Sequence, residues 1–153
     1  MLKEGDRVPA FSLADSSGTL HTLEEFAGRR LVIYFYPKDD TPGCTTEACD
    51  FRDRHKSFED RRAVVIGVSP DESSSHGKFA SKFGLPFLLL ADPGHGLIEA
   101  FGAWGEKKMY GRTFMGVIRS TFLVDGKGVI LRAWPDVSPA GHAEEVLASL
   151  ASP

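Results

Sequence analysis

The chain of 153 residues has a length typical of one domain and can bury a hydrophobic core. Its hydrophobic fraction of 42% and charged fraction of 25% exclude a disordered chain, and a net charge of −3 without a basic block argues against nucleic-acid or anionic-membrane partners. The longest apolar stretch, 85–91, is far shorter than the roughly 20 residues of a membrane span. We therefore expect a single globular domain over 1–153.

The N-terminal stretch "MLKEGDRVPAF" lacks the apolar segment of a signal peptide, which favours a cytoplasmic location. A lasting structural disulfide is unusual there, so the two cysteines of the chain, Cys44 and Cys49, call for another explanation. In the segment 11–23, a Ser-Ser-Gly turn predicts a small N-terminal hairpin.

Two continuous apolar runs, "LVIYFY" (31–36) and "AVVIGV" (63–68), predict strands that are buried on both faces of a parallel sheet. A helical pattern lies between them. After the second run, His76, Phe79 and Phe83 recur at helical spacing and predict an amphipathic helix.

The second half begins with a short strand over 87–92 and a short helix over 96–102. Residues 120–134 form two strands joined by an Asp-Gly-Lys-Gly turn. The last helix is expected to open with Ser138 as N-cap and Pro139 as its first residue. This order predicts an α/β fold whose central mixed sheet is flanked by helices, with parallel strands first and an antiparallel hairpin last.

The five histidines suggest no metal centre. His55 and His76 lie on apolar helix faces and are expected to pack in the core, whereas His21, His95 and His142 lie near turns and are expected to be solvated. A structural zinc site needs four ligands, and only His55 is close in sequence to the cysteines. We therefore expect no metal.

The stretch "YPKDDTPGCTTEAC" follows the first buried strand directly, where active sites of open α/β sheets tend to lie. Thr41 suits the N-cap and Pro42 the first position of a helix, which makes Cys44 its third residue. Free N–H groups and the helix dipole stabilise a thiolate there. Gly43 leaves the backbone open to close approach.

The two cysteines are not equivalent. Cys44 shares the buried stripe of the expected helix, whose other members are Ala48, Phe51, His55 and Phe58. Cys49 falls about 140° away, on the polar side. Asp39 and Asp40 would oppose a thiolate, so a reactive Cys44 needs a cation from elsewhere in the fold. This pattern suggests Cys44 as nucleophile and Cys49 as its partner.

A bond between the two sulfurs requires a change in the helix. Cα atoms five residues apart on a helix are separated by roughly 8.7 Å, whereas a disulfide needs about 4.4–6.8 Å. The helix must therefore unwind for the bond to form. Two simpler readings remain open at this point: unreactive buried thiols, and a non-catalytic binding module with incidental cysteines.

The segment "YFYPKDDTPGCTTEAC" resembles the active-site stretch of peroxiredoxins, because Pro37, Thr41 and Cys44 match P-x-x-x-T-x-x-C. The second cysteine is similar to that of the bacterioferritin comigratory protein, or peroxiredoxin Q, subfamily. The resemblance continues in "KKMYGRTFMGVIRSTFLVD" and in "HAEEVL", and it covers nearly the whole chain.

This resemblance implies a thioredoxin-like fold and a role for each matched residue. Cys44 would be the peroxidatic cysteine, Cys49 the resolving cysteine, and Arg119 the missing cation. Thr41 would bond the reacting sulfur and the peroxide. The remaining implied site residues are Pro37 and Gly43, which border the substrate, and Glu47, which orients Arg119.

The implied function is a thiol peroxidase for H2O2 and alkyl hydroperoxides, working as an atypical two-cysteine enzyme. Thioredoxin or a similar dithiol protein would recycle it, with no cofactor, and the chain would act as a monomer. The alternative is a thioredoxin-fold protein disulfide oxidoreductase. Such a protein would carry a C-x-x-C at the helix start, which this sequence lacks.

Overall fold

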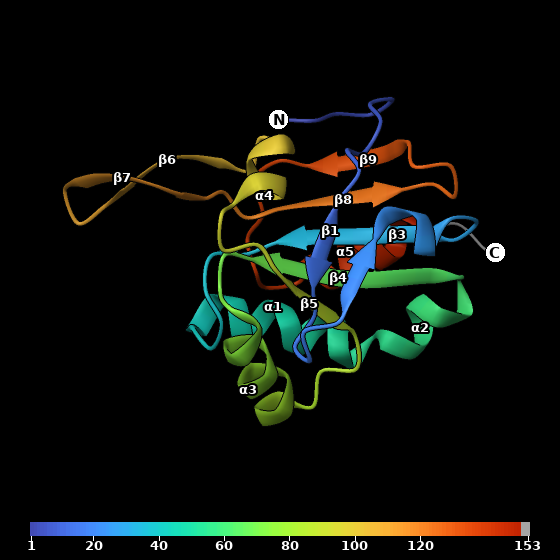
Figure 1. Ribbon diagram of the computed structural model, residues 1–153, viewed down its shortest axis with the longest axis horizontal. Coiled ribbons are helices and arrows are strands. Elements are labelled where there is room, and N and C mark those ends of the chain that lie inside the picture. The colour runs from blue at the N-terminus through green and yellow to red at the C-terminus, as the bar shows by residue number, and fades with distance from the viewer. Residues whose placement is uncertain (151–153) are drawn as a thin grey trace.

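The computed structural model describes residues 1–150, so the last three residues of the expected domain lie outside it. A seven-stranded mixed sheet forms its centre, in the order β2-β1-β5-β4-β3-β8-β9 (Figure 1). The strands are β1 (Ser12–Ala14), β2 (Leu20–Thr22), β3 (Arg30–Phe35), β4 (Ala63–Ser69), β5 (Leu88–Ala91), β8 (Ser120–Val124) and β9 (Ile130–Trp134). This arrangement confirms the predicted α/β class.

The middle of the sheet consists of the two continuous apolar runs. β3 pairs in parallel with β4, and β4 with β5, while β8 lies antiparallel on the other side of β3. Side chains on both faces of β3 and β4 are covered, which explains why these runs do not alternate. The predicted hairpins β1–β2 and β8–β9 are present as well.

Four helices cover one face of the sheet: α1 (Pro42–Asp53), α2 (His55–Asp60), α3 (Ser73–Phe83) and α5 (His142–Ser149). They pack against alternate strand residues such as Val32, Tyr34 and Val65. The other face carries α4 (Gly96–Ala100), the 3-10 helix η1 (Leu23–Phe26) and the N-terminal segment. Within residues 1–150, no helix has the length and apolar character needed to cross a membrane.

The start of the last helix differs from the prediction. α5 begins at His142, with Gly141 as N-cap in the left-handed conformation (φ 76°), and not at Ser138 and Pro139. Pro139 lies instead in the preceding loop, beside Gly43 at the start of α1. Ser-Pro suits a turn as well as a helix start, so tertiary contacts decide between the two.

The helix that bears the cysteines is shorter than its apolar stripe suggests. α1 and α2 are separate helices on either side of Arg54, whose backbone (φ −107°, ψ 9°) leaves the helical region. His55 is consequently only half-buried and pairs with Glu59 at 2.8 Å, so the expectation of a core position is wrong. Phe58 still reaches the core from α2.

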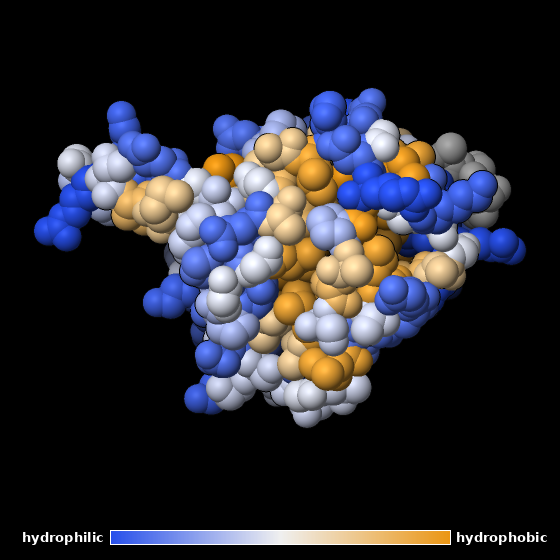
Figure 2. All heavy atoms as spheres, turned by 45° about the horizontal axis from the view of Figure 1, so that its top comes forward, coloured by the Kyte–Doolittle hydropathy of each residue, from blue (hydrophilic) through white to orange (hydrophobic). Residues whose placement is uncertain are grey.

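A hairpin that the sequence did not suggest projects from the body of the molecule (Figure 1, Figure 2). We call it the arm; it consists of β6 (Trp104–Met109) and β7 (Arg112–Val117), paired antiparallel. Its turn has positive φ at Tyr110 (52°) and Gly111 (75°), as a tight hairpin requires. Most arm side chains are exposed, so its sequence lacks the apolar-polar alternation of a half-buried strand.

The arm leaves the body at the edge of the sheet where β3 and β4 end (Figure 1). α1 begins at the same edge, directly after the loop 36–41. This edge therefore brings together the start of α1, the base of the arm and the link between β7 and β8.

Candidate active site

Cys44 lies in the first turn of α1. Thr41 is the N-cap and Pro42 the first helical residue, as predicted, and the Cys44 side chain is buried (1% exposed). The Thr41 hydroxyl donates to the Lys38 carbonyl (2.8 Å) and makes no bond to the helix N–H groups. A hydroxyl oxygen that donates in this way still has lone pairs with which to accept a hydrogen bond.

A guanidinium contacts the thiol of Cys44. Nη2 of Arg119 lies 3.2 Å from the Cys44 sulfur, and Nη1 donates to Oε1 of Glu47 at 2.7 Å. Burial alone would lower the pKa of Arg119, but the negative charges of Glu47 and of a Cys44 thiolate outweigh it and raise the pKa. The guanidinium of Arg119 therefore contacts Cys44 in the first turn of α1 and Glu47 in the second turn at the same time.

Glu47 is fully buried (0% exposed) although it carries a carboxyl group. Its Oε1 accepts from Arg119, whereas its Oε2 has no partner among the described residues. Burial raises the pKa of Glu47 to about 7, even though the charge of Arg119 favours the ionised form. This carboxyl therefore exchanges a proton near neutral pH while it stays inside the fold.

Glu47→Gln should change how stability depends on pH. The folded protein holds the Glu47 proton up to about pH 7, whereas an unfolded chain releases it near the ordinary value of a glutamate. As the pH rises from about 5 to about 8, the wild type should lose about 1–3 kcal/mol of stability relative to the variant. Urea unfolding of both proteins at several pH values, with reductant present, measures this difference.

Glu4→Gln, at an exposed position, is the matched control and should follow the wild type. Equal pH slopes for the wild type and Glu47→Gln would contradict a buried carboxyl that titrates near neutrality.

Gly43 allows two side chains to approach the start of α1. A β-carbon at Gly43 would lie 3.3 Å from Nη2 of Arg119 and 3.3 Å from Cγ of Pro139, which is tighter than an ordinary contact. Pro37, at the start of the loop, is half-buried. Cys44, Gly43 and Arg119 thus lie in direct contact, and Pro37 belongs to the loop that leads to them.

Both carboxylate oxygens of Asp39 are engaged with residues other than Cys44. Its Oδ2 lies 2.7 Å from Nδ1 of His76, and its Oδ1 accepts from the Tyr36 hydroxyl at 2.6 Å. Burial works against the charged form, but these bonds outweigh it and hold the pKa of Asp39 below its ordinary value. Asp40 is also paired, with a lysine of α3 at 2.8 Å.

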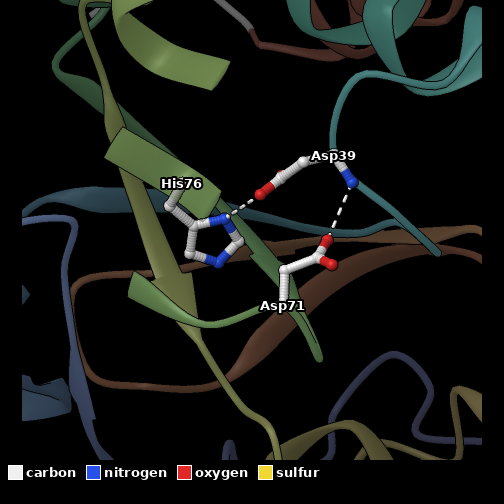
Figure 3. Close-up of side chains that lie close together, drawn as sticks. All are labelled: Asp39, Asp71 and His76. Atoms are coloured by element: carbon white, nitrogen blue, oxygen red, sulfur yellow. Dashed lines mark hydrogen bonds and ion pairs between the residues drawn. The ribbon is translucent and has the colours of Figure 1, made fainter. Parts of the chain in front are cut away.

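The Asp39–His76 pair fixes the loop after β3 to the first turn of α3 (Figure 3). Nε2 of His76 lies 3.0 Å from the Leu90 carbonyl, which can only accept, while Nδ1 faces the Asp39 carboxylate. Both ring nitrogens of His76 therefore face an oxygen atom of another element, a carboxylate on one side and a backbone carbonyl on the other. Asp71 completes the cluster by accepting the N–H of Asp39 at 2.7 Å.

Sequence reasoning missed this pair. Asp39 follows β3 and His76 follows β4, and these strands are parallel neighbours, so their carboxyl ends meet at one edge of the sheet. An acid after one buried parallel strand and a histidine after the next was the signal that could have identified it.

Asp39, Asp71 and His76 also form a group that could hold a cation, since their ligand atoms all lie within 4.8 Å of one another. Both nitrogens of His76 are engaged in hydrogen bonds, and a histidine must be neutral to bind metal. Ser69 donates to Asp71 at 2.9 Å. This set of hydrogen bonds fits an internal ion pair between Asp39 and His76 better than a metal site.

Cys49 lies on the same unbroken helix as Cys44, and both thiols are free. Cys49 is only half-buried, as its predicted place on the polar side implies. Helical geometry keeps the two Cα atoms roughly 8.7 Å apart. In this form of the protein, the two sulfurs cannot bond without unwinding of α1.

The prediction that His142 is solvated is wrong, since its side chain is buried (4% exposed). Its Nε2 lies 2.7 Å from the Thr121 hydroxyl. Burial lowers the pKa of His142, with Arg119 acting in the same direction and Glu145 against it. His21 is likewise mostly covered, with its side chain 15% exposed between two carboxylates.

The sequence of the chain is similar to those of known proteins. The AhpC/TSA family matches residues 4–133. The peroxiredoxin Bcp of Bacillus subtilis (strain 168) is 50% identical to the chain over 146 residues, which cover 95% of this chain and 93% of the relative.

Solved structures are similar over the same range. A cysteine-to-serine mutant of PrxQ from Xylella fastidiosa matches with a TM-score of 0.93 at 40% identity, over 98% of this chain and 96% of that chain. The bacterioferritin comigratory protein of Xanthomonas campestris, studied for its alkyl peroxide reduction activity in trapped intermediate and ligand complexes, is 46% identical. It has a TM-score of 0.87 over 92% of this chain and 89% of that chain. The fold is thus thioredoxin-like, as the resemblance implied.

Proposed function

Because the chain belongs to the AhpC/TSA family and is a peroxidase of the Bcp and peroxiredoxin Q type, we propose that it reduces hydroperoxides by an atypical two-cysteine cycle. Cys44 is the peroxidatic and Cys49 the resolving cysteine. The observation that carries this proposal is the 3.2 Å contact between Arg119 and the Cys44 sulfur. The other site residues in this proposal are Thr41, Pro37 and Gly43.

The first step is attack of the Cys44 thiolate on the terminal oxygen of H2O2 or an alkyl hydroperoxide. A sulfur–oxygen bond forms and the oxygen–oxygen bond breaks, so Cys44 becomes a sulfenic acid and the leaving oxygen takes a proton to give water or an alcohol. Arg119 and the first-turn N–H groups stabilise the thiolate and the charge that develops on the leaving oxygen. The Thr41 hydroxyl donates to the Lys38 carbonyl and uses a lone pair to accept a hydrogen bond from the O–H of the incoming peroxide.

The second step joins the two cysteines. α1 unwinds, Cys49 attacks the sulfenic acid, and a disulfide forms with loss of water. The guanidinium of Arg119 holds Cys44 and Glu47 together on the folded helix, so its two contacts have to be released for this step.

A dithiol protein such as thioredoxin then reduces the disulfide by thiol–disulfide exchange. Sulfur carries both electrons, so this scheme requires no metal or organic cofactor. Both cysteines belong to one chain, which supports a monomer of one domain as the working unit. The expected compartment is the cytoplasm, where such reductants keep thiols reduced.

Cys49→Ser should stop the cycle at the sulfenic acid. After one equivalent of H2O2, mass spectrometry of the wild type should show loss of two hydrogens. The variant should instead gain one oxygen atom, which a sulfenic-acid trap captures. Cys44→Ser is the control and should show neither change. Full thioredoxin-dependent turnover by Cys49→Ser would remove Cys49 from the resolving role.

A further inference from the structure

Lys107 carries a half-buried charge that has no carboxylate partner among residues 1–150. It lies on β6 of the arm, and its ammonium donates to the Val117 carbonyl at 2.9 Å, at the base of the arm. The ion pairs found within residues 1–150 that involve lysine belong to Lys3, Lys56 and Lys82. A partly desolvated cation is costly unless an anion is near, so its counter-charge has to be sought elsewhere.

Two glycines let the Lys107 side chain run back toward the body. Gly105 and Gly116 are cross-strand partners, and Lys107 projects from the same side of the arm as this pair. A β-carbon on Gly116 would lie 3.2 Å from Cδ of Lys107, and one on Gly105 would lie 2.7 Å from Cδ1 of Ile118. Because the two glycines have no side chains, the Lys107 side chain can lie along this face of the arm, and its ammonium reaches the base of the arm.

The base of the arm adjoins Arg119, since β7 ends at Val117. The pKa of Lys107 is lowered, first by burial and then by the positive charge of Arg119, while the charge of Cys44 acts in the opposite direction. The charged groups that act on Lys107 are therefore the guanidinium of Arg119 and the thiolate of Cys44. The thiolate is the only one of the two that attracts an ammonium.

We propose that Lys107 is a positioning residue of the peroxidatic site, a second cation that stabilises the Cys44 thiolate from the arm. It supplements Arg119, which touches the sulfur directly. The proposal rests on Cys44 being the reacting thiol. It also gives the arm a role, because the hairpin carries the charge to Val117, two residues before Arg119.

The expected effect of the Lys107 charge on the Cys44 thiolate follows from Coulomb attraction over several ångströms at a partly exposed site. Such an attraction changes the thiolate population, and with it the oxidation rate, by a factor on the order of five. It also weakens with ionic strength, because the Debye length is about 10 Å at 0.1 M salt.

Lys107→Met tests the proposal, with Lys108→Met as the matched control. Lys108 is the next residue on the same strand, is exposed, and projects from the opposite side of the arm. Both variants are made in the Cys49→Ser background. The measurements are the rate of Cys44 oxidation by H2O2 and the pH profile of Cys44 alkylation, at low and at high salt.

Lys107→Met should oxidise about threefold to tenfold more slowly than Lys108→Met at low salt, with its alkylation profile moved to higher pH. Lys107→Arg should restore most of the rate, and high salt should narrow the difference. Identical rates and pH profiles for the Lys107 and Lys108 variants would overturn the proposal, as would a slow Lys107→Met whose pH profile is unmoved. A Cys44 that fails to react in every protein would instead overturn the proposed function.

Discussion

Replacement of Arg119 by methionine should slow the first oxidation of Cys44 by about a hundredfold to a thousandfold. The variant removes the donor that lies 3.2 Å from the sulfur, and it also leaves the buried carboxyl of Glu47 without its partner. The loss of one preorganised donor from a site where charge develops has effects of this size. Rapid-quench mass spectrometry of a single turnover with H2O2 measures the rate.

Two further variants separate charge from geometry. Arg112→Met removes an exposed arginine of the arm and should react within about twofold of the wild type. Arg119→Lys keeps the charge but lacks the planar fork that serves Cys44 and Glu47 together, so its rate should lie between those of wild type and Arg119→Met. An Arg119→Met protein that reacts at the wild-type rate would exclude Arg119 from the site.

His76→Ala should lower the free energy of unfolding by about 3–5 kcal/mol. The His76 ring and the Asp39 carboxylate are both buried, and their contact is 2.7 Å long. Removal of one partner leaves an uncompensated charge in the interior, which costs far more than the loss of an exposed pair. Urea unfolding at neutral pH with reductant present measures the change.

His95→Ala is the matched control for this loss. His95 is only half-buried, pairs with Glu99 at 3.1 Å and stacks on Trp104, so its removal should cost about 1 kcal/mol. Equal losses of unfolding free energy for His76→Ala and His95→Ala would show that the buried Asp39–His76 pair stabilises the fold no more than the half-buried His95 contacts do. Since the pair holds the loop before α1, His76→Ala should also oxidise Cys44 more slowly than His95→Ala does.

Much of the central fold could be predicted because burial on both faces leaves a strong signal. The continuous runs at 31–36 and 63–68 became adjacent parallel strands, and the position of Cys44 in a first turn followed from Thr41 and Pro42. These features depend on residues close together in sequence. Local chemistry was therefore enough to find them.

The remaining features depend on contacts between distant segments. Arg119 lies 75 residues from Cys44 in sequence, and only family resemblance singled it out from the other arginines. The arm is exposed and carries no burial pattern, and Pro139 lies beside Gly43 of α1, from the other half of the sequence, and not at the start of α5. The two contacts of the His76 ring could not be predicted, because Asp39 and the Leu90 carbonyl belong to other elements.

The Asp39–His76 pair has a consequence for the unwinding of α1. It ties the chain before α1 to α3, and Arg52, near the end of α1, donates to the Phe83 carbonyl of the same helix at 2.8 Å. The segment that opens in the proposed cycle, between the two cysteines, would thus be held at both ends by one neighbouring helix, α3. Local melting in that cycle would leave those ends in register, so closure after reduction would require little search through chain conformations. Under the proposed mechanism, α3 would act as a fixed support that makes repeated opening of the same turn reversible.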